Sequence, residues 1–270
     1  MSYACKTLIT TSNELALREK RLSICLEADG FSFAETASGG ALVSFGGAEG
    51  RHAATMTQVM ADVKAFFNTV GIRPLGYGAM ELVVMSNESV WVPDELYSAV
   101  ANRKYLDLVG CAPESLLSCH SRELASTAVF SAIEHVVVAF KVAMPGVVVM
   151  HQHTKMAQLA RLAKEHPMLL AHWRKGRVDV AAYADGRYIF GNTLSYTNDE
   201  EAAFHLVEVM KTYRLEGPAT ELLLCGDVDR ERYARLRPYF PKVTLFNGTV
   251  NATAAEFRTL HTYRHALLLI

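Results

Sequence analysis

The amino-acid sequence predicts an α/β protein with two similar lobes, and three observations support this prediction. Residues 21–47 and 170–196 each contain three short alternating runs joined by two tight turns. Each stretch is followed by an amphipathic helical pattern, and then by strands and helices in alternation. An internal repeat of this size predicts architecture better than a single motif does. Connections long enough to hold a helix imply parallel pairing and right-handed crossovers, so we expect a mixed five-stranded sheet with flanking helices in each lobe.

The first lobe is expected to begin with three strands and a helix. Residues 1–20 are typical of a loosely attached leader with a short helix near 13–20. Apolar and polar residues then alternate over 22–26, and the Asp29-Gly30 pair is a strong hairpin-turn signal. Apolar residues at helical spacing predict a helix over 52–70 that ends at a glycine.

The middle of the chain is predicted to alternate between strands and helices, except for residues 111–126, where the sequence favours no element. Residues 135–144 have the β-branched composition of a strand, but they occupy the place of a crossover helix, so we expect a helix. Thr154 is expected to cap the helix that follows. The predicted elements are strand 81–86, helix 93–110, strand 127–133, helix 135–144, strand 147–152 and helix 154–163.

The second half repeats the order more compactly, and the segment 198–201 resembles a capping box that opens a helix. Its predicted elements are strands 168–173, 177–184 and 187–194, helix 198–213, strand 221–225, helix 229–238, strand 242–246 and helix 253–268. We expect an N-terminal lobe over residues 1–166 and a C-terminal lobe over residues 167–270. Because the loops are short throughout, the lobes should be fused along a substantial interface.

Composition and charge exclude several classes of protein. The net charge of -1 gives no basic field that would recruit nucleic acid. The five cysteines are scattered and show no disulfide pattern, so a reducing compartment and a cytoplasmic location are expected. The N-terminus lacks the features of a signal peptide, and no apolar run approaches the roughly 18 residues of a membrane span. We therefore expect no nucleic-acid binding and no direct membrane insertion.

A β-β-β-α-β-α-β-α order that occurs twice over residues 21–268 resembles the ribonuclease H-like fold of actin, hexokinase and the heat-shock ATPases. The segments 22–33, 92–96, 192–200 and 222–226 are similar to a bacterial family, widespread in Bacteroidetes, that has a degenerate actin-like ATPase fold and no assigned biochemical role. Actin-like proteins of type IV pilus assembly, and the cytoplasmic part of the type II secretion L protein, are the expected structural relatives. Because those relatives act as assembly platforms, the resemblance implies a protein partner.

The resemblance also implies where a nucleotide would lie. ATPases of this fold hold phosphate between the first hairpins of the two lobes, and each hairpin carries an Asp-x-Gly signature whose Asp holds Mg²⁺ through water. Alignment on the hairpin glycines places Ala28 and Arg174 where these two Asp residues belong. The strand that would face the adenosine ends in one glycine instead of two. The candidate cofactor-binding positions are Asp29, Gly30, Lys175, Gly176, Gly226 and Asp227.

The expected function is therefore that of a non-catalytic scaffold or adaptor, a pseudo-ATPase without a cofactor or metal ion. The alternative is a divergent ATP-binding protein, a kinase or an ATPase, that uses the interlobe cleft. It would need a displaced carboxylate such as Glu27, Asp179 or Asp227. A third possibility is a small-molecule binding module that uses the cleft without phosphate.

Two histidines at the end of one strand, His151 and His153, could place two imidazoles on one face as metal ligands. No acidic or cysteine ligand can be identified beside them from the sequence. We therefore interpret them as structural residues at the end of a strand.

Overall fold

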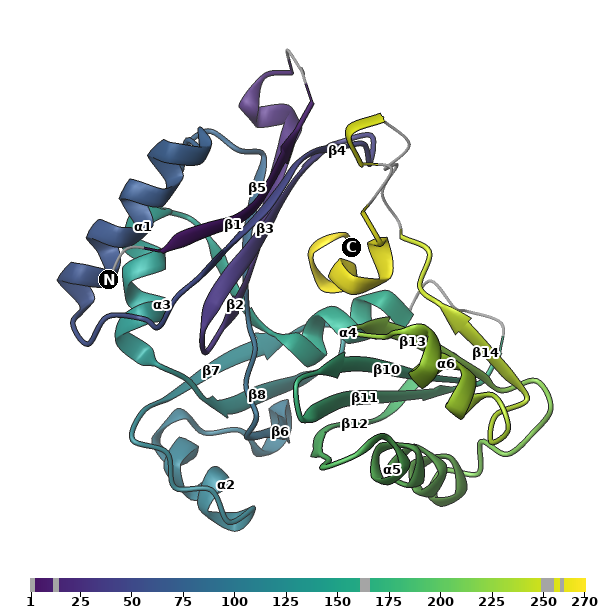
Figure 1. The fold of residues 1–270 in the computed structure, drawn as a ribbon. Coiled ribbons are helices and arrows are strands. Elements are labelled where there is room, and N and C mark those ends of the chain that lie inside the picture. Colours follow the sequence, from purple (N-terminus) through teal and green to yellow (C-terminus); the bar gives the residue numbers. More distant parts are fainter. Residues whose placement is uncertain (1–2, 12–14, 161–165, 249–254, 258–259) are drawn as a thin grey trace.

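The computed structural model describes residues 3–11, 15–160, 166–248, 255–257 and 260–270. The first lobe is built on a sheet of six described strands, arranged in the order β1-β4-β3-β2-β5-β9 (Figure 1). The strands β2, β5 and β9 are parallel, whereas β1, β4, β3 and β2 pair antiparallel. These strands are β1 (Ala4–Thr10), β2 (Lys20–Glu27), β3 (Gly30–Ala37), β4 (Leu42–Glu49), β5 (Ala79–Val84) and β9 (Val148–His151).

Two helices, α1 (Met56–Val70) and α3 (Glu134–Ala143), pack side by side on one face of this sheet. The Thr55 side chain caps α1 by accepting a hydrogen bond from the Gln58 backbone, and Gly71 ends the helix in the left-handed conformation. The apolar face of α1 is buried in a core that also contains Phe31 and Phe140. This confirms the predicted helices over 52–70 and 135–144.

A small subdomain is inserted between β5 and α3. It contains a three-stranded sheet in the order β6-β8-β7 and the helix α2 (Asn102–Leu108). Its strands are β6 (Ser89–Pro93), β7 (Leu116–Ser121) and β8 (Ser126–Ser131). The predicted helix over 93–110 is therefore wrong in part, because 3-10 turns at Asp94–Leu96 and Ala99–Ala101 precede α2.

The second lobe has five described strands in the order β12-β11-β10-β13-β14. They are β10 (Met168–Arg174), β11 (Arg177–Ala184), β12 (Arg187–Ser195), β13 (Glu221–Gly226) and β14 (Lys242–Leu245). Their order and directions match those of β4-β3-β2-β5-β9 in the first lobe. Helices α5 (Asp199–Thr212) and α6 (Arg230–Leu236) flank the sheet, and the Asn198 side chain caps α5 at 2.8 Å from the Glu201 backbone nitrogen, as predicted.

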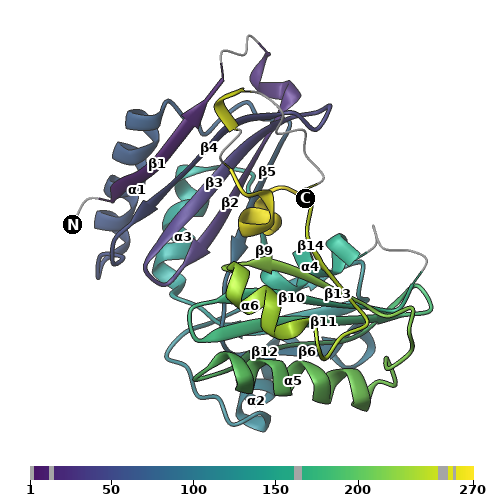
Figure 2. The same cartoon turned by 45° about the vertical axis from the view of Figure 1, so that its right-hand side comes forward.

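Helix α4 (Gln152–Ala160) and the 3-10 segment η5 (Thr262–Leu268) lie between the two lobes (Figure 2). Another 3-10 turn, η4 (Ala255–Phe257), precedes η5 along the chain. We call residues 260–270 the interlobe strap. Ala266 and Leu267 pack in a core with second-lobe residues, whereas Leu268 and Leu269 pack in a core with first-lobe residues.

Several expectations are corrected by the structure. Residues 4–10 are not a loose leader but the edge strand β1, so the first sheet has six strands rather than five. Thr154 does not cap α4, because the helix already begins at Gln152. The described parts of 253–268 form 3-10 turns, because this segment buries side chains against both lobes instead of along one face. The other residues of the predicted helices, 13–14, 161–163, 253–254 and 258–259, lie outside the described residues.

None of the helices described is long and apolar enough to cross a membrane.

Candidate functional site

A cavity of about 800 Å³ lies between the two lobes. It is bounded by the β2–β3 turn, by β4, by the ends of β10 and β13, and by the interlobe strap. The structure brings five of the six predicted positions together along its wall, and these are Asp29, Gly30, Lys175, Gly226 and Asp227. Gly176, at the tip of the β10–β11 hairpin, is not among the lining residues.

The two most tightly packed glycines of this wall are required by backbone contacts. A Cβ atom on Gly30 would lie 2.2 Å from the Ala48 carbonyl oxygen, and one on Gly226 would lie 2.2 Å from the Trp173 carbonyl oxygen. Both residues also have positive φ angles, of 150° and 82°. Strand packing thus explains both glycines without a phosphate.

Arg174, the residue that the sequence alignment placed at the expected acid position of the second hairpin, uses each of its guanidinium nitrogen atoms in a hydrogen bond. Its Nε and Nη2 donate to the two Asp179 carboxylate oxygens, each at 2.8 Å. Nη2 also donates to the Ser86 carbonyl oxygen at 3.2 Å, and Nη1 donates to Asn87 Oδ1 at 3.1 Å. Arg174 therefore bridges the second lobe to the end of β5 in the first.

Asp179 is fully buried in β11 and accepts several further hydrogen bonds. Thr193 Oγ1 donates to it at 2.7 Å, and the distance from His172 Nδ1 to its Oδ2 is 3.1 Å. Burial alone would raise the pKa of this carboxyl group, but the hydrogen bond from His172 and the charge of Arg174 hold it well below its usual range. Asp179 is therefore a structural anion, and it is not available as the displaced carboxylate of a nucleotide site.

Gln152, the first residue of α4, extends this arrangement. Its Oε1 accepts a hydrogen bond from the Ser86 backbone nitrogen at 2.9 Å, and its Nε2 donates to the Ser86 carbonyl oxygen and, at 3.4 Å, to Asp179. We call these residues, together with Arg174, the interlobe network. Sequence analysis missed its members Ser86 and Gln152; the one available signal was an acidic residue inside the apolar run of β11.

The other two candidate carboxylates, Glu27 and Asp227, do line the cavity. Glu27 is reached by solvent from the cleft, but the surrounding protein desolvates its carboxyl group and raises its pKa. Asp227 lies 3.3 Å from Arg264 Nη1 of the interlobe strap. Within the described part of the chain, no group of three or more His, Cys, Asp and Glu side chains is arranged to hold a metal ion.

The interlobe strap fills much of the space between the lobes. The side chains from Ala266 to Leu269 are buried, and Leu267 and Leu268 also form part of the cavity wall. The ammonium group of Lys155 on α4, which is fully buried, donates to the Ile270 carbonyl oxygen at 3.2 Å and pairs with Glu81 at 2.6 Å. Polar contacts thus hold the strap at its end while its apolar side chains join the two cores.

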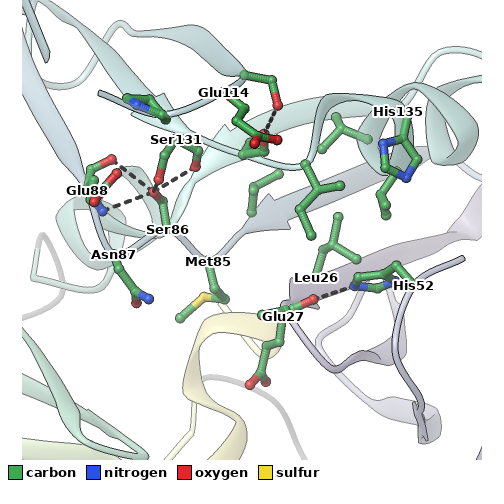
Figure 3. Close-up of a pocket in the computed structure, with 18 residues that line it drawn as sticks. Leu26, Glu27, His52, Met85, Ser86, Asn87, Glu88, Glu114, Ser131 and His135 are labelled. Carbon is green, nitrogen blue, oxygen red and sulfur yellow. Dashed lines mark hydrogen bonds between the residues drawn. The ribbon is translucent and has the colours of Figure 1, made fainter. Parts of the chain in front are cut away.

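A second cavity, of about 470 Å³, lies between the first lobe and the inserted subdomain (Figure 3). Its floor is apolar and includes Leu26 and Val136, and its lining includes the glutamates Glu88 and Glu114. We call it the acidic groove. Its lining residues come from the β2 end, the β5–β6 connection, the segment before β7 and the start of α3.

His151 and His153 are fully buried and stacked, with ring centroids 5.4 Å apart. Burial lowers the pKa of both rings, in His153 to about 4. His151 Nε2 and His153 Nδ1 have no hydrogen-bond partner among the described residues. The pair therefore packs as neutral rings at the start of α4.

Comparison with known proteins places this geometry in a known fold. A family model described as "Protein of unknown function (DUF3822)" matches residues 10–243. A Bacteroides thetaiotaomicron VPI-5482 protein with an actin-like ATPase fold and unknown function is similar in structure, with a TM-score of 0.70 and 17% identity over 91% of this chain and 97% of that chain.

Two further solved structures are similar over nearly their whole length. A chain of the PilM-PilN type IV pilus biogenesis complex has a TM-score of 0.58 at 11% identity, covering 93% of this chain and 97% of that chain. The ethanolamine utilization protein EutJ from Carboxydothermus hydrogenoformans has a TM-score of 0.53 at 11% identity, covering 97% and 93%. No curated protein matches this chain significantly. These likenesses confirm the actin-like fold and the expected relation to pilus-assembly proteins.

Proposed function

This chain belongs to the DUF3822 family, which is described as being of unknown function, and we propose that it is a non-catalytic scaffold or adaptor that binds another protein. The proposal includes a cytoplasmic location, a pseudo-ATPase cleft and an internal duplication of the lobe. The shared strand order of the two sheets supports the duplication. The buried thiols Cys25 and Cys225, which form no disulfide, support a reducing compartment.

The observation that carries the proposal is the position of Arg174. A metal-bound nucleotide needs a carboxylate there, because Asp oxygens hold Mg²⁺ through water. The guanidinium carries the opposite charge, and four of its five N–H groups donate to Asp179, Ser86 and Asn87. The Arg174 side chain therefore links the two lobes by hydrogen bonds within the protein itself.

The interlobe strap supports the same conclusion. It contributes residues to both lobe cores, so the lobes are held together by buried apolar side chains instead of by a ligand. An assembly platform benefits from such a fixed shape. The similar PilM-PilN structure is a complex of two proteins, which supports a protein partner for this chain as well.

A thermal-shift experiment with Mg-ATP tests the proposal. A nucleotide at 100 times its dissociation constant stabilises a protein by about 2.7 kcal/mol. For a chain of this size such a stabilisation raises Tm by roughly 5–10 °C. We expect no shift at millimolar Mg-ATP, and a shift of this size would refute the scaffold proposal.

The alternative of a divergent ATP-binding protein is favoured by one observation, the convergence of five predicted positions on the large cavity. It predicts a Tm shift with Mg-ATP that is reduced in Lys175→Ala and Asp227→Asn. Both side chains are exposed, so these variants should keep the fold. Substitution of Gly226 is unsuitable for this purpose, because its Cβ would collide with the Trp173 backbone whether or not a nucleotide binds.

A further inference from the structure

The acidic groove has a charge pattern that distinguishes it from the interlobe cavity. Two glutamates, Glu88 and Glu114, line it, whereas no lysine or arginine is among the described residues of its lining. The third glutamate at this pocket, Glu27, points its carboxyl group away from the groove (Figure 3). Glu88 and Glu114 come from the β5–β6 connection and from the segment before β7. The fold therefore brings together acidic residues that are not neighbours in the sequence.

The two histidines of the groove, His52 and His135, are hydrogen-bonded within the first lobe. The two ring nitrogens of His52 lie 2.6 Å from the Glu27 carbonyl oxygen and 2.7 Å from the Tyr3 hydroxyl, and burial lowers the pKa of this ring. His135 donates from Nε2 to the Ala53 carbonyl oxygen at 3.0 Å. Both rings are fixed by contacts within the first lobe.

The floor of the groove is apolar, and Ile133 at its edge offers exposed apolar surface to a ligand. Leu26, Val84, Val136 and Val137 are buried beneath it. Ile133, at the N-terminal end of α3, is 42% exposed as a residue. A cavity of about 470 Å³ lies within the range of roughly 300–1,000 Å³ that is usual for ligand pockets, so it has room for a few side chains of a bound segment.

From this combination we propose that the acidic groove is the docking site for a partner protein, through a short segment in which apolar side chains stand next to lysine or arginine. The apolar side chains contact Ile133 and the floor, and the basic ones face Glu88 and Glu114. Charge complementarity of this kind guides encounter and excludes acidic partners. The inference rests on the proposed function, since it names the surface and the partner chemistry of the adaptor.

The test uses the full chain and fluorescein-labelled eight-residue peptides. One peptide has the sequence RLLIRLGS, and a second has glutamate in place of both arginines. Fluorescence anisotropy should show saturable binding of the arginine peptide that weakens with salt, and at least about tenfold weaker binding of the glutamate peptide. Equal binding of both peptides, or no binding of the arginine peptide at 1 mM, would overturn the proposal.

Substitutions of groove residues test whether the peptide binds there. Glu114→Lys and Glu88→Lys, alone and together, should weaken the arginine peptide by about tenfold or more, whereas Glu95→Lys, an exposed site of the same subdomain outside the groove, should not. Ile133→Ser should also weaken binding, although serine is the better helix N-cap and should leave the fold intact. Equal effects of Glu95→Lys and Glu114→Lys would contradict the assignment.

Two further results separate this inference from other readings of the same surface. Full displacement of the arginine peptide by equimolar spermidine would show a site for small cations and overturn the protein-docking proposal. The thermal-shift experiment with Mg-ATP tests the proposed function separately, because a nucleotide would bind in the interlobe cavity and not in the groove. If the peptide does not bind and Mg-ATP causes no Tm shift, the docking proposal for the groove is refuted but the scaffold proposal is not.

Discussion

Replacing Arg174 by methionine tests whether its guanidinium holds the two lobes together. The substitution keeps an apolar stem but leaves the buried Asp179 carboxylate without its charged partner. Removing one partner of a buried ion pair costs about 3–5 kcal/mol, because the remaining charge is desolvated and uncompensated. Asp179 keeps its bonds from His172 and Thr193, so we expect the lower end, a loss of about 3 kcal/mol in the free energy of unfolding.

Urea unfolding followed by the fluorescence of Trp91 and Trp173 measures this loss. The matched control is Arg177→Met on the same hairpin, where the structure shows no side-chain bond in the described part of the chain. We expect this control to change stability by no more than about 0.5 kcal/mol.

The pH dependence supplies a second signature. Because the folded-state pKa of Asp179 lies below the value of about 3.9 in unfolded chains, its contribution to stability is fully present above that value. The contribution is lost progressively as the pH falls from there through the folded-state pKa. Without Arg174 the pKa of Asp179 rises, so the variant should lose less stability on acidification. The interlobe role of Arg174 would be refuted if the free energy of unfolding of Arg174→Met stayed within about 0.5 kcal/mol of wild type and fell with acidification as the wild type does.

Three further predictions concern buried groups. The pKa of His153 is about 4 in the folded chain and near 6.5 in unfolded ones, so stability should fall as the pH drops from about 6.5 to 4, and urea titrations should show a shallower fall in His153→Gln. A Cβ on Gly191 would lie 1.4 Å from the Tyr188 hydroxyl oxygen, so Gly191→Ala should lower the free energy of unfolding by about 1–3 kcal/mol. Urea titrations should show a smaller loss when Tyr188 is replaced by phenylalanine, which has no hydroxyl group. Leu267→Ala in the interlobe strap should cost about 2–5 kcal/mol and speed amide hydrogen exchange in both lobes, and faster exchange in only one lobe would contradict its bridging role.

Local patterns allowed much of the fold to be predicted. The strands β2, β3, β10 and β11 combine alternating side chains with glycine-containing turns, and both signals act within a few residues. Strand β1 was missed because nothing near it in the sequence shows that it pairs with β4, some forty residues away. The helix predicted at 253–268 failed because Ala266 to Leu269 are buried from two sides, which removes the one-sided pattern of a helix on a surface.

The candidate site was predictable in position but not in its interactions. Alignment on the hairpin glycines places Ala28 and Arg174 where the resemblance leads us to expect acids, and hairpin geometry brings Asp29 and Lys175 to one cavity. The pairing of Arg174 with Asp179, and the bonds of Gln152 to Ser86, depend on how the lobes meet, which no short-range pattern encodes. The acidic groove was missed for the same reason, since its glutamates are isolated in the sequence.

The five consecutive polar residues 151–155 are all buried. Gln152 finds its partners in both lobes, and Lys155 finds its partners in the first sheet and in the strap. Within residues 1–166 alone, Gln152 would keep Ser86 and Lys155 would keep Glu81, but Gln152 would lose Asp179 and Lys155 would lose the Ile270 carbonyl oxygen. A buried polar group that loses a hydrogen-bond partner costs about 1–3 kcal/mol. Folding of the two halves is therefore mutually dependent, and heating should melt them in one calorimetric transition.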